Sequence, residues 1–356
     1  MNARVVAVLV VLLAALGGGA LLVRQQSESQ RPADAASLAQ PLFKGLQAAA
    51  VAAVAIRQPK GAITIEKKGE RWVIAELDSF PADYDKLRDF VLKAIALKIG
   101  QSEPIGEKDR ARLLLDAGGT VIELRGADGK PLARLTAGKK YFKAEPENPE
   151  RAIGDGRYVA LPGEEKRVIV ISDPLTQASA KTADWISKAG FEVEKIKSLE
   201  LRAADGSAWK IQRSGDNADW KLAGARGDEK LEVSKANAAA YTFGRIELAD
   251  AAPKGLKPED AGLDKPTVVT ATTLDGLTYT LKVGRLEGEN HYASIAVAGE
   301  PKPEGPDAEA RLKKISERLT REKELAQYVV LVPKSKLEDI LKKRADLLAK
   351  KDEKKK

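Results

Sequence analysis

The residue types that most often perform catalysis are nearly missing from this sequence. It has no cysteine, which excludes thiol nucleophiles, thiolate metal sites and disulfides. His291 is its one histidine, so a Ser-His-Asp triad or a histidine metal site would need at least this residue. Because His291 stands beside Tyr292 at the start of a strand-like run, we expect a hydrogen-bonded or exposed histidine rather than a general base.

Carboxylates could still do chemistry at a few places. Acidic pairs stand at residues 164–165 and 259–260, but paired acids hydrolyse glycosides only across a cleft, and both pairs lie in polar stretches typical of solvated loops. The stretch GDGRYV could bring Asp155 and Arg157 together at the rim of a pocket. As the start of a strand it needs no function, and this is the interpretation that we favour.

Other sequence motifs of catalysis are absent as well. There is no Walker phosphate loop, nucleophile elbow, zinc-protease motif or EF-hand loop. Aromatic residues make up only 5% and do not alternate with basic ones, which argues against a nucleic-acid partner. We therefore predict a protein that is not an enzyme and has no catalytic, cofactor-binding or metal-binding residue. A hydrolase that uses Asp or Glu is the least favoured hypothesis.

The N-terminal segment carries the strongest signal for location. Residues 5–23, VVAVLVVLLAALGGGALLV, contain no charge and lie between Arg4 and Arg24. A helix of this length spans about 28 Å, roughly the hydrocarbon core of a bilayer. It predicts a transmembrane anchor, and the alternative is a signal peptide cleaved after Ala20. In both cases the rest of the chain crosses the membrane, and the apolar run continuing through residues 21–23 favours the anchor.

The flanking segments complete this topology. We expect residues 1–24 to form a cytoplasmic tip and anchor in the bacterial inner membrane, residues 25–42 a flexible stalk, and the body to lie in the periplasm. The formal net charge is +8, from 60 basic and 52 acidic residues that are mostly interleaved. Excess lysine gathers in the basic tail, residues 349–356. This tail is either a solvated end or a contact with anionic lipid or wall polymer.

One structural plan occurs twice along the body. The chain of 356 residues suits about two domains. The plan of residues 55–171 recurs in 198–332: a hairpin with Trp72 or Trp220, a helix, a strand at 96–100 or 244–248, and a second hairpin. Both tryptophans are expected in the core, with ligand stacking as the alternative. We predict an α+β fold with two tandem copies of an antiparallel sheet-plus-helix module.

Local signals place the elements within each copy. Asp83 and Ser234 are expected to cap the two helices. Asp-Gly dipeptides at 128–129 and 275–276 suit tight hairpin turns, and Gly138 and Gly284 are expected to end the strands that follow. The buried helix positions are then Leu87, Phe90, Val91, Ala94 and Ile95 in one copy and Ala236, Ala239, Ala240 and Phe243 in the other.

The second copy has a charged insertion at 301–326. Leu312, Ile315 and Leu319 stand at helical spacing, so a surface helix is expected there. Another helix is predicted at 334–348, with a counterpart at 176–188 around Trp185. The predicted domains are therefore residues 43–188 and 189–348.

Several short sequence motifs resemble those of a known family. They are Trp72, FPAD at 80–83, GKPLARLTAG at 129–138 and GRYVAL at 156–161. With the N-terminal span, they resemble the bacterial family called domain of unknown function 4340. The second copy departs from it, because EVSKAN lacks the Pro-Ala-Asp corner. The resemblance implies a membrane-anchored extracytoplasmic accessory to ABC-type export systems, including those of gliding motility, and it implies no catalytic residue.

Two classes of function remain open for the body. The first is a structural accessory of an ABC-type transporter, with membrane lipid contacted through the N-terminal helix and an ABC permease-type membrane complex as the partner. The alternative is a periplasmic binding module for cell-wall glycan or peptide. We expect the partner contact on the insertion 301–326, because inserted segments on a rigid scaffold often carry function, and we expect its deletion to leave the fold intact.

Overall fold

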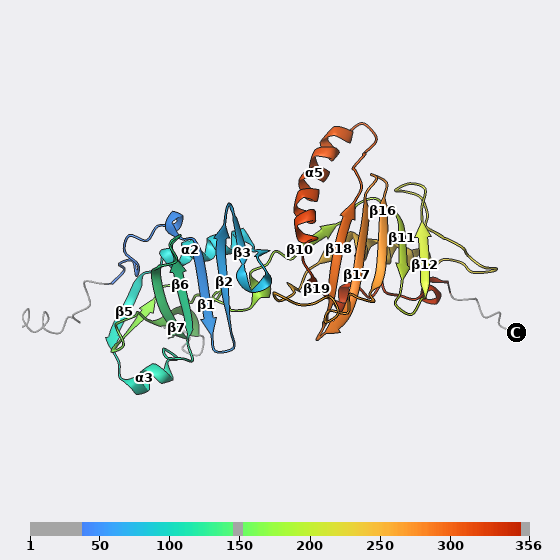
Figure 1. Ribbon diagram of the computed structural model, residues 1–356. Helices are drawn as coiled ribbons and strands as arrows, with labels where there is room; N and C mark the ends of the chain where they lie inside the picture. Colours follow the sequence, from blue (N-terminus) through green and yellow to red (C-terminus); the bar gives the residue numbers. More distant parts are fainter. Residues whose placement is uncertain (1–37, 145–151, 350–356) are drawn as a thin grey trace, which may run out of the picture. The chain divides into compact units, whose positions relative to one another are not determined.

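The computed structural model describes residues 38–144 and 152–349 (Figure 1). The predicted anchor at 5–23, the stalk up to residue 37 and the tail from residue 350 lie outside these ranges. Within them, no helix is both long and apolar enough to cross a bilayer. The end of the predicted stalk belongs to the folded body, because the Ala39 amide donates to the Ile99 carbonyl at 2.8 Å and Leu42 is buried.

The first sheet has nine strands and is built from antiparallel pairs such as β1 with β6 and β7 with β8. Its order is β4-β3-β2-β1-β6-β7-β8-β9-β5. Polar and apolar residues alternate along strands such as β6, so one face of the sheet is buried. The strands are β1 Ala53–Gln58, β2 Gly61–Lys68, β3 Arg71–Ile74, β4 Phe80–Pro81, β5 Ile99–Pro104, β6 Thr120–Arg125, β7 Pro131–Ala144, β8 Ala152–Ala160 and β9 Arg167–Ile171.

The second sheet has eight strands in the order β13-β12-β11-β16-β17-β18-β19-β15. A separate ribbon pairs β10 Ala189–Glu192 with β14 Arg245–Glu247. The strands of the large sheet are β11 Ile196–Arg202, β12 Ala208–Gln212, β13 Lys221–Leu222, β15 Asp250–Ala251, β16 Thr267–Thr273, β17 Thr278–Glu287, β18 Asn290–Ala298 and β19 Val330–Pro333.

Helices are few in the described ranges. The α-helices there are α2 Tyr84–Ile95, α3 Glu107–Arg112, α4 Val233–Gly244 and α5 Ala308–Leu325. The short 3₁₀ turns are η1 Ala48–Ala50, η2 Ala75–Leu77, η3 Thr182–Asp184, η4 Lys334–Lys336 and η5 Arg344–Leu347. Antiparallel sheets with segregated helices confirm the predicted α+β class.

The two large sheets have the same strand order. Apart from the extra edge strand β4, the order β3-β2-β1-β6-β7-β8-β9-β5 corresponds position by position to β13-β12-β11-β16-β17-β18-β19-β15. The registers also agree around the tryptophans, because Ile65 pairs with Ile74 and Ile211 with Leu222. Trp72 on β3 therefore corresponds to Trp220, which directly precedes β13. This correspondence supports the interpretation as two copies of one module.

Close contacts divide the chain into two compact units. Among the described residues, one contains 38–62, 88–144 and 152–179, and the other contains 63–87 and 180–349. The segment 63–87 groups with the second unit through contacts such as the hydrogen bond from the Asp83 amide to the Trp185 carbonyl at 2.7 Å. The ring of Phe80 meets Tyr328 edge-on, with 4.9 Å between centroids. The predicted boundary between residues 188 and 189 stays a prediction.

One predicted helix cap is confirmed and the other is wrong. The Lys86 amide donates to Asp83 Oδ1 at 3.2 Å, as expected for an N-cap. In the second copy α4 begins one residue before Ser234, and its hydroxyl donates to Glu232 Oε1 instead of accepting from the helix. The buried face of α4 is nonetheless the predicted one, with Ala236, Ala239 and Phe243 inside.

The two predicted helices at 176–188 and 334–348 are wrong. They contain only η3 in the first range and η4 and η5 in the second. Local turn bonds occur in both ranges, but other backbone carbonyls accept hydrogen bonds from distant segments, so the turns do not continue into a helix. Examples are the Trp185 carbonyl, the Lys342 carbonyl with Trp209 Nε1 at 2.7 Å, and the Leu347 carbonyl with the Glu232 amide at 2.9 Å.

The glycines expected to end strands lie inside them. Gly138 is within β7 and Gly284 within β17, both at register irregularities. A Cβ on Gly138 would meet the Leu113 carbonyl oxygen at 2.1 Å, and one on Gly284 the Ala261 carbonyl oxygen at 2.1 Å. Each of those carbonyls accepts a hydrogen bond from the residue after the glycine, at 2.9 Å. Glycine is therefore required by close backbone approach, at the same place in both sheets.

Replacing either glycine with alanine tests this requirement. Gly284→Ala or Gly138→Ala should lower the free energy of unfolding by about 1–3 kcal/mol, because the Cβ forces the two backbones apart. Urea unfolding followed by circular dichroism measures it. Gly215→Ala is the control, since nothing lies within 4 Å of its added Cβ. Equal stability of all three variants would contradict the close-approach explanation.

Candidate functional site

Two of the residues that the sequence offered for chemistry, His291 and Arg157, contact backbone carbonyls. His291, in β18, has its Nδ1 atom 3.0 Å from the Gly284 carbonyl oxygen. Arg157 occupies the corresponding place in β8 and donates from Nε to the Gly138 carbonyl at 2.8 Å. Its Nη1 also reaches the carbonyls of Pro174 and Leu175, each at 3.2 Å. Burial lowers the pKa of Arg157. The two side chains thus bind backbone carbonyls at equivalent register irregularities of the two sheets.

The candidate acids are not brought together. Asp155 is exposed and makes no ion pair with Arg157, whose guanidinium points to carbonyls. The pairs at 164–165 and 259–260 are exposed as well. Among the described residues, no group of three or more His, Cys, Asp or Glu side chains could hold a metal ion.

A buried polar cluster links α5 to the second sheet, and sequence reasoning missed it. Tyr279 donates from its hydroxyl to Glu322 Oε2 at 2.7 Å, and the Glu192 amide donates to Glu322 Oε1 at 3.0 Å. Arg318 places Nε 3.6 Å from Glu322 Oε1. Burial raises the pKa of Glu322, and burial followed by the neighbouring Glu322 raises the pKa of Tyr279. The spacing of Ile315, Leu319 and Glu322 was the available signal, since all three lie on one helix face.

The cluster makes α5 more than a surface helix. Its predicted location within 301–326 is confirmed, and it runs along β18 and β10 (Figure 1). Ile315, Leu319, Leu325 and the fully buried Glu322 form its inner side, and Arg311 pairs with the hairpin residue Asp275. Deleting the insertion would open the core, so the expectation that deletion leaves the fold intact does not suit this packing.

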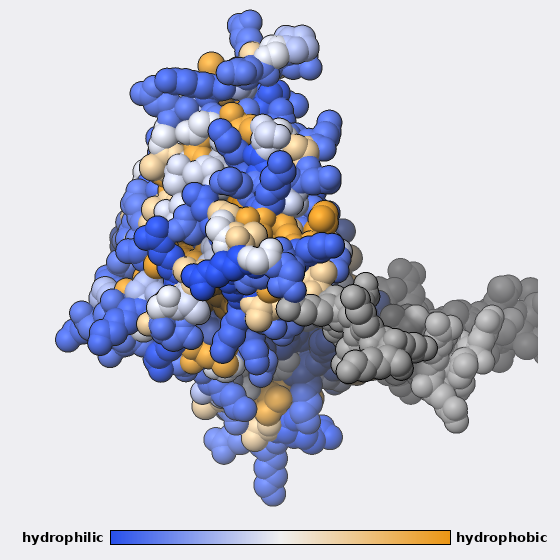
Figure 2. Space-filling view, turned by 90° about the vertical axis from the view of Figure 1, so that its right-hand side faces the viewer, coloured by the Kyte–Doolittle hydropathy of each residue, from blue (hydrophilic) through white to orange (hydrophobic). Residues whose placement is uncertain are grey.

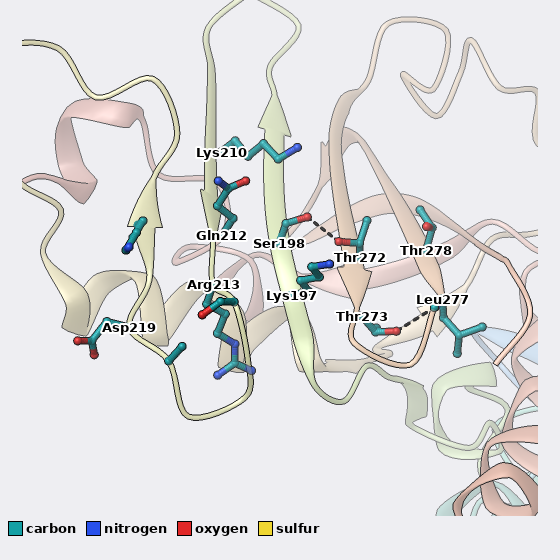
Figure 3. A pocket seen from close by; sticks show the side chains of 14 residues that line it. Lys197, Ser198, Lys210, Gln212, Arg213, Asp219, Thr272, Thr273, Leu277 and Thr278 are labelled. Carbon is teal, nitrogen blue, oxygen red and sulfur yellow. Dashed lines mark hydrogen bonds between the residues drawn. The ribbon is translucent and has the colours of Figure 1, made fainter. Parts of the chain in front are cut away.

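A hollow of about 940 Å³ lies on the outer face of the second sheet (Figure 3). We call it the sheet groove. It is lined by residues of β11, β12 and β16, the turn into β17 and the loop 213–221. Four of its lining residues are cationic, namely Lys197, Lys210, Arg213 and Lys221, and Asp219 is the acidic one. The groove is therefore polar and mainly basic.

Side chains across the groove follow the strand register. Ser198 pairs with Gln212 on one side and with Thr272 on the other, and Thr272 pairs in turn with Thr278. The hydroxyls of Ser198 and Thr272 are 2.6 Å apart, and Thr273 Oγ1 accepts from the Leu277 amide at 3.0 Å. Hydroxyl and amide groups thus form a row over four strands, and neighbouring strands are about 4.8 Å apart.

Arg213 is fixed at one end of the groove. Its Nε donates to the Ile196 carbonyl at 2.7 Å, and Nη2 pairs with Asp216 at 2.6 Å. The guanidinium carbon lies 4.8 Å from the ring centroid of Trp220. Trp220 in turn donates from Nε1 to Asn237 Oδ1 at 3.0 Å. Trp220 is therefore a covered core residue, as expected, and its face is not available for a ligand.

A smaller hollow of about 480 Å³ adjoins Arg213 on its other side. Tyr241 of α4 lines it and is 68% exposed, the highest exposure among the large apolar or aromatic residues described. Arg245 lies 5.7 Å from the Tyr241 ring centroid. Glu192 and Glu194 also line this hollow, so its charge is mixed and it favours neither sign of ligand.

Comparison with known proteins assigns the chain to a family. Neither the curated proteins nor the solved structures contain a significant match to this chain. A family model does match, over residues 72–266, which is more than half of the 356 residues. The matched range begins at Trp72 and includes β11, β12 and Arg213 of the sheet groove. The chain belongs to the family described as Domain of unknown function (DUF4340).

Proposed function

We propose that this protein is a membrane-anchored extracytoplasmic accessory of an ABC-type transport system, and that it acts by holding a partner rather than by catalysis. The observation that carries the proposal is the engagement of His291 and Arg157 with backbone carbonyls. A general base needs a partner that orients it towards a nucleophile or substrate. His291 instead contacts a carbonyl at a register irregularity of the sheet, and the always-charged guanidinium of Arg157 occupies the equivalent place. The apolar run at 5–23 supplies the anchor in this proposal.

The outer side of α5 is the proposed partner surface. The helix is absent from the first copy, and its inner side is anchored by Glu322 and Arg311. A helix held in this way presents its outer side without reordering, which lowers the entropic cost of binding. The outward residues are exposed and mostly charged, namely Glu309, Lys313, Lys314, Glu317, Arg321 and Lys323.

Location is tested by fractionation. Salt and carbonate washes should leave the full chain in the membrane pellet, because an apolar helix of 19 residues is not extracted by charge or pH. A protease added to spheroplasts should digest the body from outside. A shortened soluble form that begins near Leu21 would show cleavage instead, and protection from the protease would overturn the proposed location.

Partner binding is tested by charge reversal on α5. Lys313→Glu, Lys314→Glu and Arg321→Glu together should reduce co-purification with permease and ATPase subunits at least tenfold from detergent-solubilised membranes. The matched control is Lys108→Glu, Lys139→Glu and Lys140→Glu, which changes the same charge at exposed residues of α3 and β7. Undiminished co-purification of the α5 variant would exclude this surface.

A binding module for cell-wall glycan or peptide is the second candidate function. The specific observation in its favour is the sheet groove, with about 940 Å³ and several cationic side chains. The side of the molecule drawn in Figure 2 is mostly hydrophilic, with apolar residues in small separate patches. Such a surface suits polar ligands better than an apolar partner.

A further inference from the structure

We propose that the sheet groove binds a carboxylate-bearing glycan, laid across β12, β11 and β16. The proposal deepens the second candidate function, since it names the ligand class and the residues. It depends on the second sheet alone and therefore does not require the α5 partner. The first support is the row of Gln212, Ser198, Thr272 and Thr278, whose positions are adjacent in the sheet register.

This row places hydrogen-bonding groups at a regular spacing, with Gln212 and Thr278 on either side of the bonded pair of Ser198 and Thr272, of which Ser198 is 9% exposed. Neighbouring strands are about 4.8 Å apart, so three steps of the row cover roughly 15 Å. Hydroxyl and amide side chains can both donate and accept, which matches the hydroxyls of successive sugar units. Figure 3 shows the Ser198–Thr272 pair at the centre of the groove, with Gln212 and Thr278 on either side.

The charges of the groove select an anion. Lys197 and Lys221 are exposed, and neither side chain forms an ion pair with another described residue. Lys210 forms an ion pair with Glu200 at 3.5 Å, and Arg213 forms one with Asp216 at 2.6 Å. Lys197 and Lys221 are therefore the cations free to receive a carboxylate.

A glycan fits these features better than an acidic peptide. Peptides bind through backbone pairing at a sheet edge, through pockets for apolar side chains or, where they are acidic, through clusters of arginines. Among the described residues, Arg213 is the one arginine that lines the groove, and it is paired with Asp216. The groove lies on a sheet face, and its apolar lining consists of Ala218 and Leu277, of which Leu277 is 1% exposed. It therefore offers side-chain hydroxyls and charges but no apolar pocket. Binding through exposed lysines should also weaken with salt.

The test uses the full chain in nanodiscs of neutral lipid. Calorimetric titration compares a hyaluronan hexasaccharide, which carries carboxylates, with chitohexaose, which is neutral, and with octaglutamate. The hyaluronan oligosaccharide should bind at least tenfold more tightly than either of the other two. Octaglutamate binding as tightly or more tightly would assign the groove to acidic peptides, and no detectable hyaluronan binding at millimolar concentration would overturn the proposal.

Substitutions then locate the binding. Lys197→Gln with Lys221→Gln should weaken hyaluronan binding at least tenfold, whereas Lys282→Gln with Lys254→Gln should leave it unchanged. The control pair removes the same two positive charges. Lys282 belongs to the same sheet, and Lys254 is exposed elsewhere in the second unit. Equal loss in both pairs would indicate a non-specific charge effect and overturn the site. Co-purification with the transporter is measured separately, so either proposal can fail alone.

Discussion

Trp209→Ala is expected to lower the free energy of unfolding by about 3–5 kcal/mol. The indole of Trp209 is 3% exposed in the core of the second sheet, so truncation leaves a large cavity. It also removes the hydrogen bond from Nε1 to the Lys342 carbonyl, at 2.7 Å. That carbonyl belongs to the chain segment between η4 and η5, which forms no long helix. We therefore expect the variant to loosen this segment as well as the core.

Trp72→Ala is the matched comparison. Trp72 is only half-buried on β3, so its removal uncovers less apolar surface and should cost clearly less than the loss of Trp209. Both variants are measured by urea unfolding followed by circular dichroism. Amide hydrogen exchange at residues 334–348 should increase in Trp209→Ala and stay unchanged in Trp72→Ala. Equal stabilities of the two variants would contradict the burial difference.

Glu322→Ala is the second substitution with a large expected effect. It should cost about 3–5 kcal/mol, because the Tyr279 hydroxyl and the Glu192 amide both lose their buried acceptor. Arg318 also loses the nearby carboxylate and, among the described residues, keeps only its ion pair with Glu194, at 2.9 Å. Glu322→Gln retains an acceptor for Tyr279 and should cost less. A melting series on wild type, Glu322→Gln and Glu322→Ala measures both. If Glu322→Ala were as stable as wild type, the cluster would not hold α5 in place.

The same carboxyl predicts a pH dependence of stability. Burial raises the pKa of Glu322, so the folded state binds its proton more strongly than the unfolded state. The free energy of unfolding should therefore fall as the pH rises from the ordinary glutamate pKa, about 4.3, towards the raised value. Glu322→Gln should remove this part of the slope. Asp250 has a pKa raised by burial and adds a slope of the same sign, so Asp250→Asn is the separate control.

Local patterns in the sequence determined most of the elements. Alternating apolar residues and Asp-Gly turns were enough to predict the hairpins, because side-chain alternation and positive φ are properties of adjacent residues. Gly129 and Gly276 indeed have φ angles of 76° and 86°. The cap at Asp83 and the helix in the insertion were predicted for the same reason. The weak similarity of the two halves also anticipated the shared strand order.

Elements that depend on distant partners could not be predicted in this way. The ranges 176–188 and 334–348 were predicted as helices, but several of their carbonyls bond to residues far away in the sequence. Gly138 and Gly284 lie where a second backbone segment approaches closely. The residues next to them in the sequence do not predict this approach. His291 and Arg157 occupy matching positions. That they contact equivalent carbonyls, of Gly284 and Gly138, appears only in the folded sheets.

The candidate site shows the same division. The sequence by itself determined that few reactive side chains exist, because composition fixes which chemistry is available. Only the tertiary structure decided where polar groups meet. Lys197 and Thr272 are far apart in the chain but line one groove, since β11 and β16 pair directly. In the sequence, Glu322 is one of many charged residues of the insertion. Only the packing of α5 against the sheet shows that its side chain is buried.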